Sequence, residues 1–300
     1  MITSLDLMVE KVLETGIKHR IAVAWAHDSN TVRALGEAVR DGFAEALMVG
    51  EPDKIIQVCR SAGIDPDLFK IISSGNEDDA SHLAVRLVKN GDADIIMKGL
   101  LGTDKYLKAI MDKENGLMLP DTMLSYVGAI EIPEYHKLLF VTDPAVIPYP
   151  DLSQKIVMAE YAIEMARKLG VDKPRIALLG ASEKPSRHFR YSEDYQAMCR
   201  MAEKGEIKNC IMDGPLDLFL ACDRKSLEVK GIGTPVGGDA DILLFPSLEA
   251  CNPFYKGLML FAKGKIAGLI RGTQKPVILM SRNESEKSKY YCIALSCLMV

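Results

Sequence analysis

Short apolar segments alternate with amphipathic segments along most of this chain, and this alternation limits the possible fold more than any other feature. In the first third, the apolar runs expected as strands lie at 20–26, 45–50, 69–73 and 93–97, and the stretches expected as helices lie at 31–42, 52–62 and 78–90. Strands that alternate with helices of this length need crossover connections. The pattern therefore predicts βαβ units and a mostly parallel sheet.

The middle of the chain departs from this pattern and indicates a domain boundary. Apolar segments at 122–132 and 136–141 flank a Pro-Glu-Tyr sequence, which is typical of a hairpin. A proline-rich stretch at 143–150 follows. The second alternation has a helix expected at 152–169, strands at 175–180, 210–214 and 241–246, helices at 193–204, 216–222 and 251–263, and a last strand at 277–280. We predict two α/β domains, residues 1–142 plus 275–300 and residues 143–274.

The composition narrows the class of protein. Of the 300 residues, 48% are hydrophobic and 26% are charged, and the net charge of −4 gives no electrostatic footprint for nucleic acid. The seven cysteines form no C-x-x-C pair, which favours a reducing compartment. The first residues lack the pattern of a signal peptide, and no stretch has the length of a membrane span. We expect a cytoplasmic protein with neither nucleic-acid nor membrane partners.

Common nucleotide and metal motifs are missing. The sequence has no Walker A motif, and the glycine-rich stretch at 231–238 misses G-x-G-x-x-G by one residue and precedes a strand, whereas a dinucleotide fingerprint follows one. The five histidines are scattered, without the spacing of zinc ligands. A Rossmann dehydrogenase and a metal site are both disfavoured.

The tail of the chain offers a place for anionic chemistry. The last expected strand ends in Ser281 and Arg282, with Ser285 shortly after. The carboxyl ends of strands form the edge where α/β proteins bind ligands. Arg282 would offer a fork of donors to a phosphate or an oxyanion, and Ser281 an adaptable hydroxyl. The alternative is a helix-capping serine beside a solvated arginine.

Two further segments follow expected strands and carry cations. Lys98 and Thr103 stand between a strand and a helix, where backbone amides can hold an anion, although a simple capped turn would look the same. The stretch 184–190 is dense in cations, with Arg187 and Arg190 among them. It is either an anion site at a strand end or a solvated face.

Two more segments lie later in the chain. Gly238 and Asp239 form part of a run in which glycine permits close backbone approach. Glu249 to Asn252 occupies a strand-to-helix turn, where Asn252 could also be an N-cap. Cys251 and Cys292 are expected to be small buried residues rather than nucleophiles.

Six segments together resemble the phosphate acetyltransferase/phosphate butyryltransferase family, closest to its phosphotransbutyrylase branch. They are residues 97–99 with Thr103, 138–143, 213–216, 238–243, 249–252 and 277–282. The resemblance implies transfer of a short or branched acyl group between coenzyme A and inorganic phosphate. It also implies a two-domain αβα sandwich with mostly parallel sheets, like isocitrate and isopropylmalate dehydrogenases, with the active site in the interdomain cleft.

Further implications of the resemblance concern ligands and residues. Coenzyme A would be a substrate, with no tightly bound cofactor or metal, and the protein would form a homodimer or larger homo-oligomer. Ser281 would steady the thiol, and Arg282 would stabilise charge in the transition state. The residues expected to contact acyl-CoA or phosphate are Lys98, Thr103, Ser125, Arg187, Arg190, Gly238, Asp239, Glu249, Asn252 and Ser285.

The chain departs from the family pattern at four positions. Met118 stands where the butyryltransferase branch has arginine, Tyr126 where it has histidine, and Cys251 where it has glycine. Ser288 occupies the position of an aspartate, the presumed base of the acetyltransferase branch. The arginines of the 184–190 stretch also depart from the family's usual sequence, and one hypothesis is that they relocate the phosphate site.

These departures keep a second function open. The chain could be a diverged paralogue that binds coenzyme A or an acyl phosphate without turnover. A dehydrogenase-like enzyme of the same fold, acting on a hydroxyacid phosphate, is disfavoured because the sequence lacks the acid cluster that would bind its metal.

Overall fold

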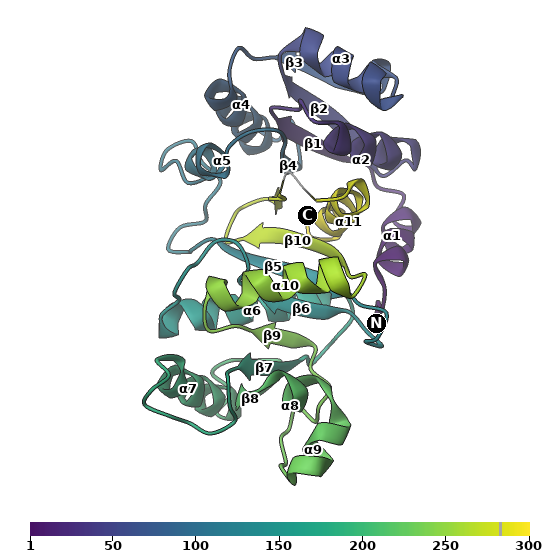
Figure 1. The fold of residues 1–300 in the computed structure, drawn as a ribbon. Helices are drawn as coiled ribbons and strands as arrows, with labels where there is room; N and C mark the ends of the chain where they lie inside the picture. Colours follow the sequence, from purple (N-terminus) through teal and green to yellow (C-terminus); the bar gives the residue numbers. More distant parts are fainter. Residues whose placement is uncertain (282–283) are drawn as a thin grey trace. The chain divides into compact units, whose positions relative to one another are not determined.

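The structure, a computed structural model, describes residues 1–281 and 284–300. The chain forms two compact units: unit 1 comprises Met1–Leu5 and Ser125–Ile266, and unit 2 comprises Asp6–Leu124 and Ala267–Val300. Strands and helices alternate through both, and most strand pairs are parallel, which confirms the predicted α/β fold (Figure 1). The predicted division at 142/143 and 274/275 differs from these limits and stays a prediction.

Unit 2 is built on a sheet whose parallel strands include the C-terminal one. Its strands are β1 (His19–Ala24), β2 (Ala44–Gly50), β3 (Lys70–Ser73), β4 (Ile95–Lys98), β10 (Lys265–Arg271, which begins at the end of unit 1) and β11 (Val277–Ile278). Their order is β3-β2-β1-β4-β11-β10. All neighbours are parallel except β10, which runs antiparallel to β11.

Helices cover both faces of this sheet. They are α1 (Leu5–Glu14), α2 (Ser29–Arg40), α3 (Pro52–Ala62), the 3-10 helix η1 (Pro66–Leu68), α4 (Glu77–Lys89), α5 (Thr103–Ile110) and α11 (Glu286–Leu298). Helix α2 packs against α3 and α11, whereas α4 packs against α5 on the other face (Figure 1). Right-handed crossovers explain this division, because β2 and β4 lie on opposite sides of β1.

Unit 1 repeats the scheme with a hairpin at its start. Its strands are β5 (Ser125–Glu131), β6 (Leu139–Thr142), β7 (Arg175–Leu179), β8 (Ile211–Leu216) and β9 (Ile242–Leu244), and its helices are α6 (Leu152–Lys168), α7 (Tyr191–Glu203), α8 (Leu218–Cys222), α9 (Arg224–Lys230) and α10 (Leu248–Phe261). The strand order is β5-β6-β9-β7-β8. Only β5 and β6 are antiparallel, which confirms the predicted hairpin. No helix among the described residues is long and apolar enough to cross a membrane.

Two elements differ from the sequence prediction for local reasons. Strand β10 was not predicted, because Gly268 interrupts a short apolar run and glycine weakens strand propensity. Helix α10 begins at Leu248, three residues before the predicted start, with Ser247 as its N-cap. Pro253 lies inside this helix, where proline is disfavoured, so the pattern indicated a later beginning. Asn252 is therefore a helix residue and not an N-cap.

A buried ion pair fastens α11 to the start of α2. The Nζ atom of Lys289 lies 2.8 Å from Oδ1 of Asp28 and 2.8 Å from the hydroxyl of Thr31. Only 4% of the Lys289 side chain is exposed. Burial alone would raise the pKa of Asp28, but Lys289 and the hydrogen bonds from Thr31 lower it below its usual value. The charged pair therefore stabilises the folded state.

Replacing Lys289 with methionine is expected to lower the free energy of unfolding of unit 2 by about 3 kcal/mol at pH 7, because Asp28 stays buried without its cation. The stabilising contribution of Asp28 is present above its unfolded pKa of about 3.9 and is lost as the pH falls through its lower folded pKa. The difference between variant and wild type should therefore shrink below about pH 4. Urea unfolding followed by the fluorescence of Trp25, the single tryptophan, reports on this unit.

The matched control is Lys287→Met on the same helix. Lys287 forms a half-exposed ion pair with Glu37 at 3.2 Å, so its loss should change the free energy by less than about 1 kcal/mol. An equal decrease in the free energy of unfolding in the two variants would show that the buried Lys289–Asp28 pair stabilises the protein no more than the exposed pair does.

Candidate functional site

Three strands of unit 2 end side by side at the carboxyl edge of its sheet. Strand β4 lies between β1 and β11, with Lys98 opposite Ala24 and Met97 opposite Ile278. Lys98 and the residues after Ile278, including Ser281, therefore lie at one edge, as the sequence predicted. The helices that follow β1 and β4 lie on opposite faces (Figure 1). Such a switch point is where open α/β sheets bind ligands.

Lys98 is held in place by a tightly packed turn. Its side chain is almost fully buried, and its Nζ lies 3.4 Å from the carbonyl oxygen of Gly99. The Gly99 N–H donates to the carbonyl of Ala24 at 2.9 Å. A Cβ at Gly99 would lie 2.3 Å from the carbonyl oxygen of Trp25, so only glycine allows this approach. The turn fixes a cation at the switch point.

The helix after this turn presents its N-terminus to the same edge. Helix α5 begins at Thr103, and its N-cap Gly102 supplies no side-chain cap. Thr103 is exposed, so its hydroxyl and the first-turn amides can meet a ligand. The Tyr106 hydroxyl donates to the carbonyl of Ile278 at 3.1 Å, which ties α5 to β11. Lys98, Thr103 and the tail thus belong to one assembly of elements.

The C-terminal segment contains one candidate for substrate contact within the described residues, Ser281, and one helix-capping residue, Ser285. Ser281 is exposed just beyond β11, whereas Arg282 lies outside the described residues. The Ser285 hydroxyl caps α11 by accepting the Ser288 N–H at 3.0 Å, so it has a structural role. Ser288 is buried in the first turn of that helix. The position that carries an acid in the acetyltransferase branch therefore holds no base.

A separate group of predicted residues gathers at the carboxyl edge of unit 1. The Ser125 hydroxyl and the Tyr126 N–H donate to Oδ2 of Asp143 at 2.9 and 3.0 Å. The N–H groups of residues 145 and 146 donate to its Oδ1 at 2.7 and 2.8 Å. Burial raises the pKa of Asp143, and these four donors oppose that rise. The Asn252 amide donates to the carbonyl of Pro144 at 2.8 Å. Ser125 and Asn252 thus both hold the loop that begins at Asp143.

The neighbouring residues Glu249 and Cys251 differ in solvent exposure. Glu249 is exposed, and its hydrogen bond with Tyr149 raises the pKa of that tyrosine. Cys251 is fully buried, and burial raises the pKa of its thiol well above the usual value. Burial likewise raises the pKa of Cys292 to about 12. Both thiols are protonated at neutral pH and shielded, which agrees with their expected role as packing residues.

The structure describes all seven cysteines as free thiols. Among residues 1–281 and 284–300, His, Cys, Asp and Glu form no group of three or more that could hold a metal ion.

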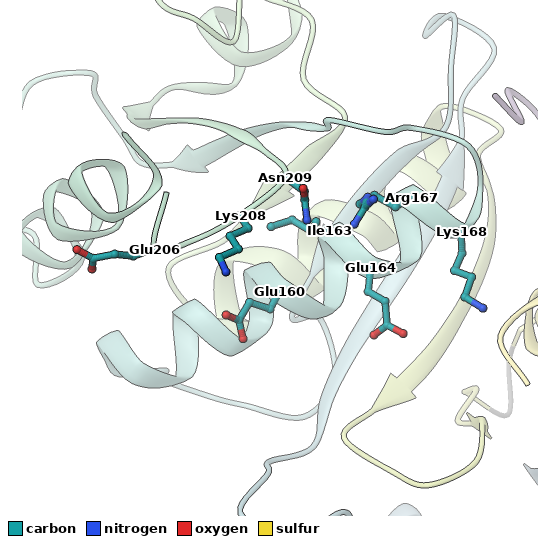
Figure 2. Close-up of a pocket in the computed structure, with 8 residues that line it drawn as sticks. All are labelled: Glu160, Ile163, Glu164, Arg167, Lys168, Glu206, Lys208 and Asn209. Atoms are coloured by element: carbon teal, nitrogen blue, oxygen red, sulfur yellow. The ribbon is translucent and has the colours of Figure 1, made fainter. Parts of the chain in front are cut away.

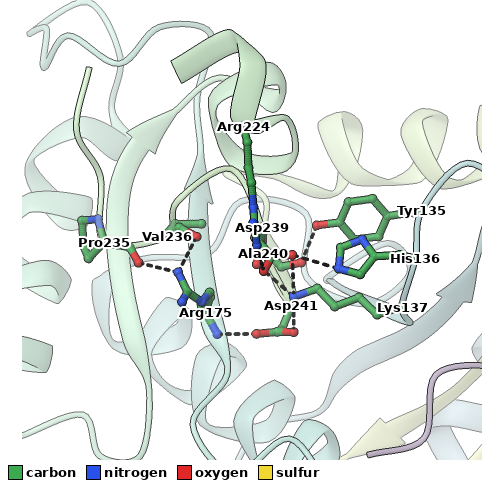
Figure 3. A network of polar contacts seen from close by, with 10 residues as sticks. All are labelled: Tyr135, His136, Lys137, Arg175, Arg224, Pro235, Val236, Asp239, Ala240 and Asp241. Atoms are coloured by element: carbon green, nitrogen blue, oxygen red, sulfur yellow. Dashed lines mark hydrogen bonds and ion pairs between the residues drawn. The ribbon is translucent and has the colours of Figure 1, made fainter. Parts of the chain in front are cut away.

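Gly238 and Asp239, which the sequence predicts as substrate contacts, lie away from the carboxyl edge of the sheet. They precede β9, so they stand at the amino edge of the parallel strands. The Asp239 carboxylate meets Lys137 and His136 at 3.1 Å and Arg224 at 3.0 Å (Figure 3). Gly238 adopts φ of +64°, and a Cβ there would lie 2.6 Å from the backbone nitrogen of Arg224. The glycine and the carboxylate serve an internal network.

That network has a second carboxylate that joins two strands. Asp241 accepts from Lys137 at 2.6 Å and from the backbone N–H of Arg175 at 2.8 Å (Figure 3). Lys137 precedes β6 and Arg175 opens β7, so the carboxylates pin the amino ends of neighbouring strands. Burial alone would raise the pKa of Asp239, but Lys137 and Arg224 lower it below its usual value. Both carboxylates therefore form ion pairs with cations of the protein itself.

Arg187 and Arg190 occupy the loop between β7 and α7, at the carboxyl edge of unit 1. Both are exposed, and neither side chain has a hydrogen bond or ion pair with any described residue. This loop is therefore a cationic surface available to an anion.

A groove of about 630 Å³ lies at the amino edge of unit 1 and is an unfavourable place for the site. It runs along α6 and the segment before β8 (Figure 2). Acidic and basic side chains both line it: the lining residues are Glu160, Ile163, Glu164, Arg167, Lys168, Glu206, Lys208 and Asn209. Ligands of such sheets bind at the opposite edge, and mixed charges give no preference for an anion.

Replacing Asp143 with asparagine is expected to loosen the loop at 143–147. The amide nitrogen of asparagine would face N–H donors and leave them unsatisfied, so the opening free energy should fall by about 2 kcal/mol. Amide hydrogen exchange of this segment, measured by mass spectrometry, reports the change. Asp151→Asn, which alters the cap of α6, is the control and should leave the segment unchanged. Unaltered protection in the Asp143 variant would contradict the role given to this carboxylate.

The chain is 36% identical over 299 residues to a phosphate butyryltransferase of Clostridium acetobutylicum, covering 100% of this chain and 99% of that protein. A branched-chain phosphotransacylase of Enterococcus faecalis has a similar structure, with a TM-score of 0.82 and 28% identity over 93% of this chain and 98% of that one.

A more distant likeness concerns the fold alone. The 4-hydroxythreonine-4-phosphate dehydrogenase of Klebsiella pneumoniae matches with a TM-score of 0.52 and 14% identity over 93% of this chain and 98% of that one. This likeness agrees with the predicted α/β fold class. The family described as phosphate acetyl/butaryl transferase matches residues 73–297, about three quarters of the chain. The chain therefore belongs to the phosphate acetyl/butaryl transferase family.

Proposed function

We propose that the protein transfers a short or branched acyl group between coenzyme A and inorganic phosphate. The observation that carries this proposal is the placement of Lys98 and Ser281 at adjoining strand ends of unit 2. The relatives support it, because they carry the names phosphate butyryltransferase and branched-chain phosphotransacylase. Acyl-CoA and phosphate are then the substrates.

The reaction needs charge stabilisation more than a covalent intermediate. A phosphate oxygen attacks the thioester carbonyl carbon, the C–S bond breaks, and coenzyme A leaves as a thiolate that takes up a proton. The phosphate brings negative charge to the carbonyl carbon, and an oxyanion develops on the carbonyl oxygen. Lys98 and the amides at the start of α5 would hold the phosphate, because both present positive charge at the carboxyl edge. Thr103 would add a hydroxyl donor.

The tail residues would act on the thioester. We assign Ser281 to steady the sulfur as it gains or loses its proton, and Arg282 to stabilise the oxyanion, as the family resemblance implies. A guanidinium suits this role because it stays charged and offers parallel N–H donors. Ser285 would position the segment by capping α11 rather than by touching substrate.

The predicted residues of unit 1 would have supporting roles. Ser125 and Asn252 are proposed to position the loop after Asp143, since their polar groups already bond within it. Glu249, which is exposed at this edge, is proposed to contact a substrate.

Compartment and assembly are further parts of the proposal. Free thiols at all seven cysteines support a reducing cytoplasm. A homodimer or larger homo-oligomer is proposed from the family resemblance.

A paralogue that binds the substrates without turnover is the second candidate. Met118 favours it, because a half-buried methionine replaces the arginine of the butyryltransferase branch and cannot hold phosphate. Phosphate-dependent turnover decides between the two.

With butyryl-CoA and phosphate, release of free thiol should depend on phosphate and should be followed with a thiol-reactive dye. Ser281→Ala and Lys98→Met should each lower kcat by about 10²-fold, the scale for losing one oriented group in the transition state. Arg282→Lys should lose activity as well, because a lysine cannot reproduce the fork.

Lys108→Met is the control, since Lys108 lies exposed on α5 beyond its first turn, and its activity should equal that of the wild type. Binding of butyryl-CoA without any phosphate-dependent thiol release would favour the paralogue. Full activity in the Ser281 and Lys98 variants would place the chemistry elsewhere.

A further inference from the structure

A cavity of about 360 Å³ opens at the carboxyl ends of β7 and β9 in unit 1. Its lining residues are Leu179, Gly180, Ala181, Phe189, Tyr191, Leu218, Phe245, Pro246, Ala250 and Phe254. Helix α7 leads from β7 to β8, and helix α10 leads from β9 to β10. Since β8 and β10 lie on opposite sides of the β7–β9 pair in the strand order, right-handed crossovers place the two helices on opposite faces of the sheet. The cavity therefore occupies a switch point of its own sheet, and its size is within the range of small-molecule sites.

Two aromatic pairs form much of the cavity wall. The rings of Phe189 and Tyr191 stack with centroids 5.3 Å apart and an interplanar angle of 15°. The rings of Phe245 and Phe254 are tilted by 44°, with centroids 5.0 Å apart. The Tyr191 hydroxyl accepts the Ala181 N–H at 3.0 Å, which fixes that ring against the strand end. Such walls suit a flat, aromatic ligand group.

A cationic loop adjoins the aromatic wall. Phe189 stands between cationic neighbours: the loop between β7 and α7 carries Lys184, Arg187 and Arg190. Its one acid, Glu183, is paired with Lys230 at 3.3 Å, and that contact helps to lower the pKa of Glu183. The three cations have no ion pair with any described residue. Helix α7 begins at Tyr191 and adds the positive end of its dipole.

Taken together, these features point to one kind of ligand. We propose that the cavity binds the adenine nucleotide end of coenzyme A, with the base between the aromatic pairs and the phosphates on Lys184, Arg187 and Arg190. The inference rests on the proposed acyl transfer, and it assigns these cations to the nucleotide instead of to inorganic phosphate. An acyl chain would fill the cavity but would leave the cations without a function. Inorganic phosphate would use the cations but not the aromatic wall.

Binding of adenosine 3′,5′-bisphosphate, measured by titration calorimetry, tests this directly and needs no turnover. The wild type should bind it, and Phe189→Ala and the double variant Arg187→Ala/Arg190→Ala should each bind at least tenfold more weakly, from lost stacking and lost phosphate pairing. The controls are Phe261→Ala and Arg200→Ala, an exposed phenylalanine at the end of α10 and an exposed arginine at the far end of α7. Both should bind as the wild type does.

Steady-state kinetics with two acyl donors separates contacts to the nucleotide of coenzyme A from contacts to its pantetheine and acyl parts. The site variants should raise KM for butyryl-CoA at least tenfold, with kcat and the phosphate KM unchanged. With butyryl-pantetheine, which lacks the nucleotide, the variants and the wild type should have equal KM. Equal effects on both substrates, a raised phosphate KM, or a changed preference for acyl length with normal nucleotide binding would each overturn the inference.

The proposed function and this inference can fail separately. Nucleotide binding that depends on Phe189 and the two arginines, in a protein without thiol release, would support the site and refute the transferase. Thiol release without binding of adenosine 3′,5′-bisphosphate would support the transferase and refute the nucleotide site. Far-UV circular dichroism checks that each variant folds, and the double arginine variant alters only exposed side chains.

Discussion

The parallel pairing of β4 with β11 is the contact on which unit 2 depends. It places the end of the chain inside a sheet that the N-terminal segment began, with Val277 opposite Ile96. Contacts between segments so distant in sequence must offset the entropy of closing a large loop. Full burial of both strands, the Tyr106 bond to Ile278 and the Lys289–Asp28 pair provide the compensating interactions. Without this pairing, Ser281 would have no fixed relation to Lys98.

The two edges of the parallel strands have different tasks in unit 1. At the amino edge, Asp239 and Asp241 meet Lys137, and these charges pin strand ends to one another. At the carboxyl edge, the cations of the β7–α7 loop have no protein partner among the described residues. Charges that form ion pairs within the protein stabilise the fold, whereas unpaired cations beside an aromatic cavity are suited to a ligand. The direction of the strands thus separates structural charge from binding charge.

Much of the fold could be predicted from local patterns, but the site could be predicted only in part. Periodicity gave the alternation and the hairpin of β5 and β6, because those signals lie within a few residues of each other. The sheet edge at which Asp239 lies could not be predicted from its motif, since a motif shows residue types and not which sheet edge they occupy. The position of Asp239 just before a strand was the sequence signal that this residue lies at the amino edge. The cavity walled by Phe189 and Phe254 was missed, because its residues come from separate elements that only the fold brings together.

The central claim is that this chain exchanges an acyl group between sulfur and a phosphate oxygen. Phosphorus NMR of the protein with butyryl-CoA and inorganic phosphate tests it most directly, because an acyl phosphate has its own resonance. The account predicts that butyryl phosphate and free coenzyme A appear together in equal amounts, and that Ser281→Ala slows both equally. Release of coenzyme A with free butyrate and no acyl phosphate, or no reaction at all, would contradict it.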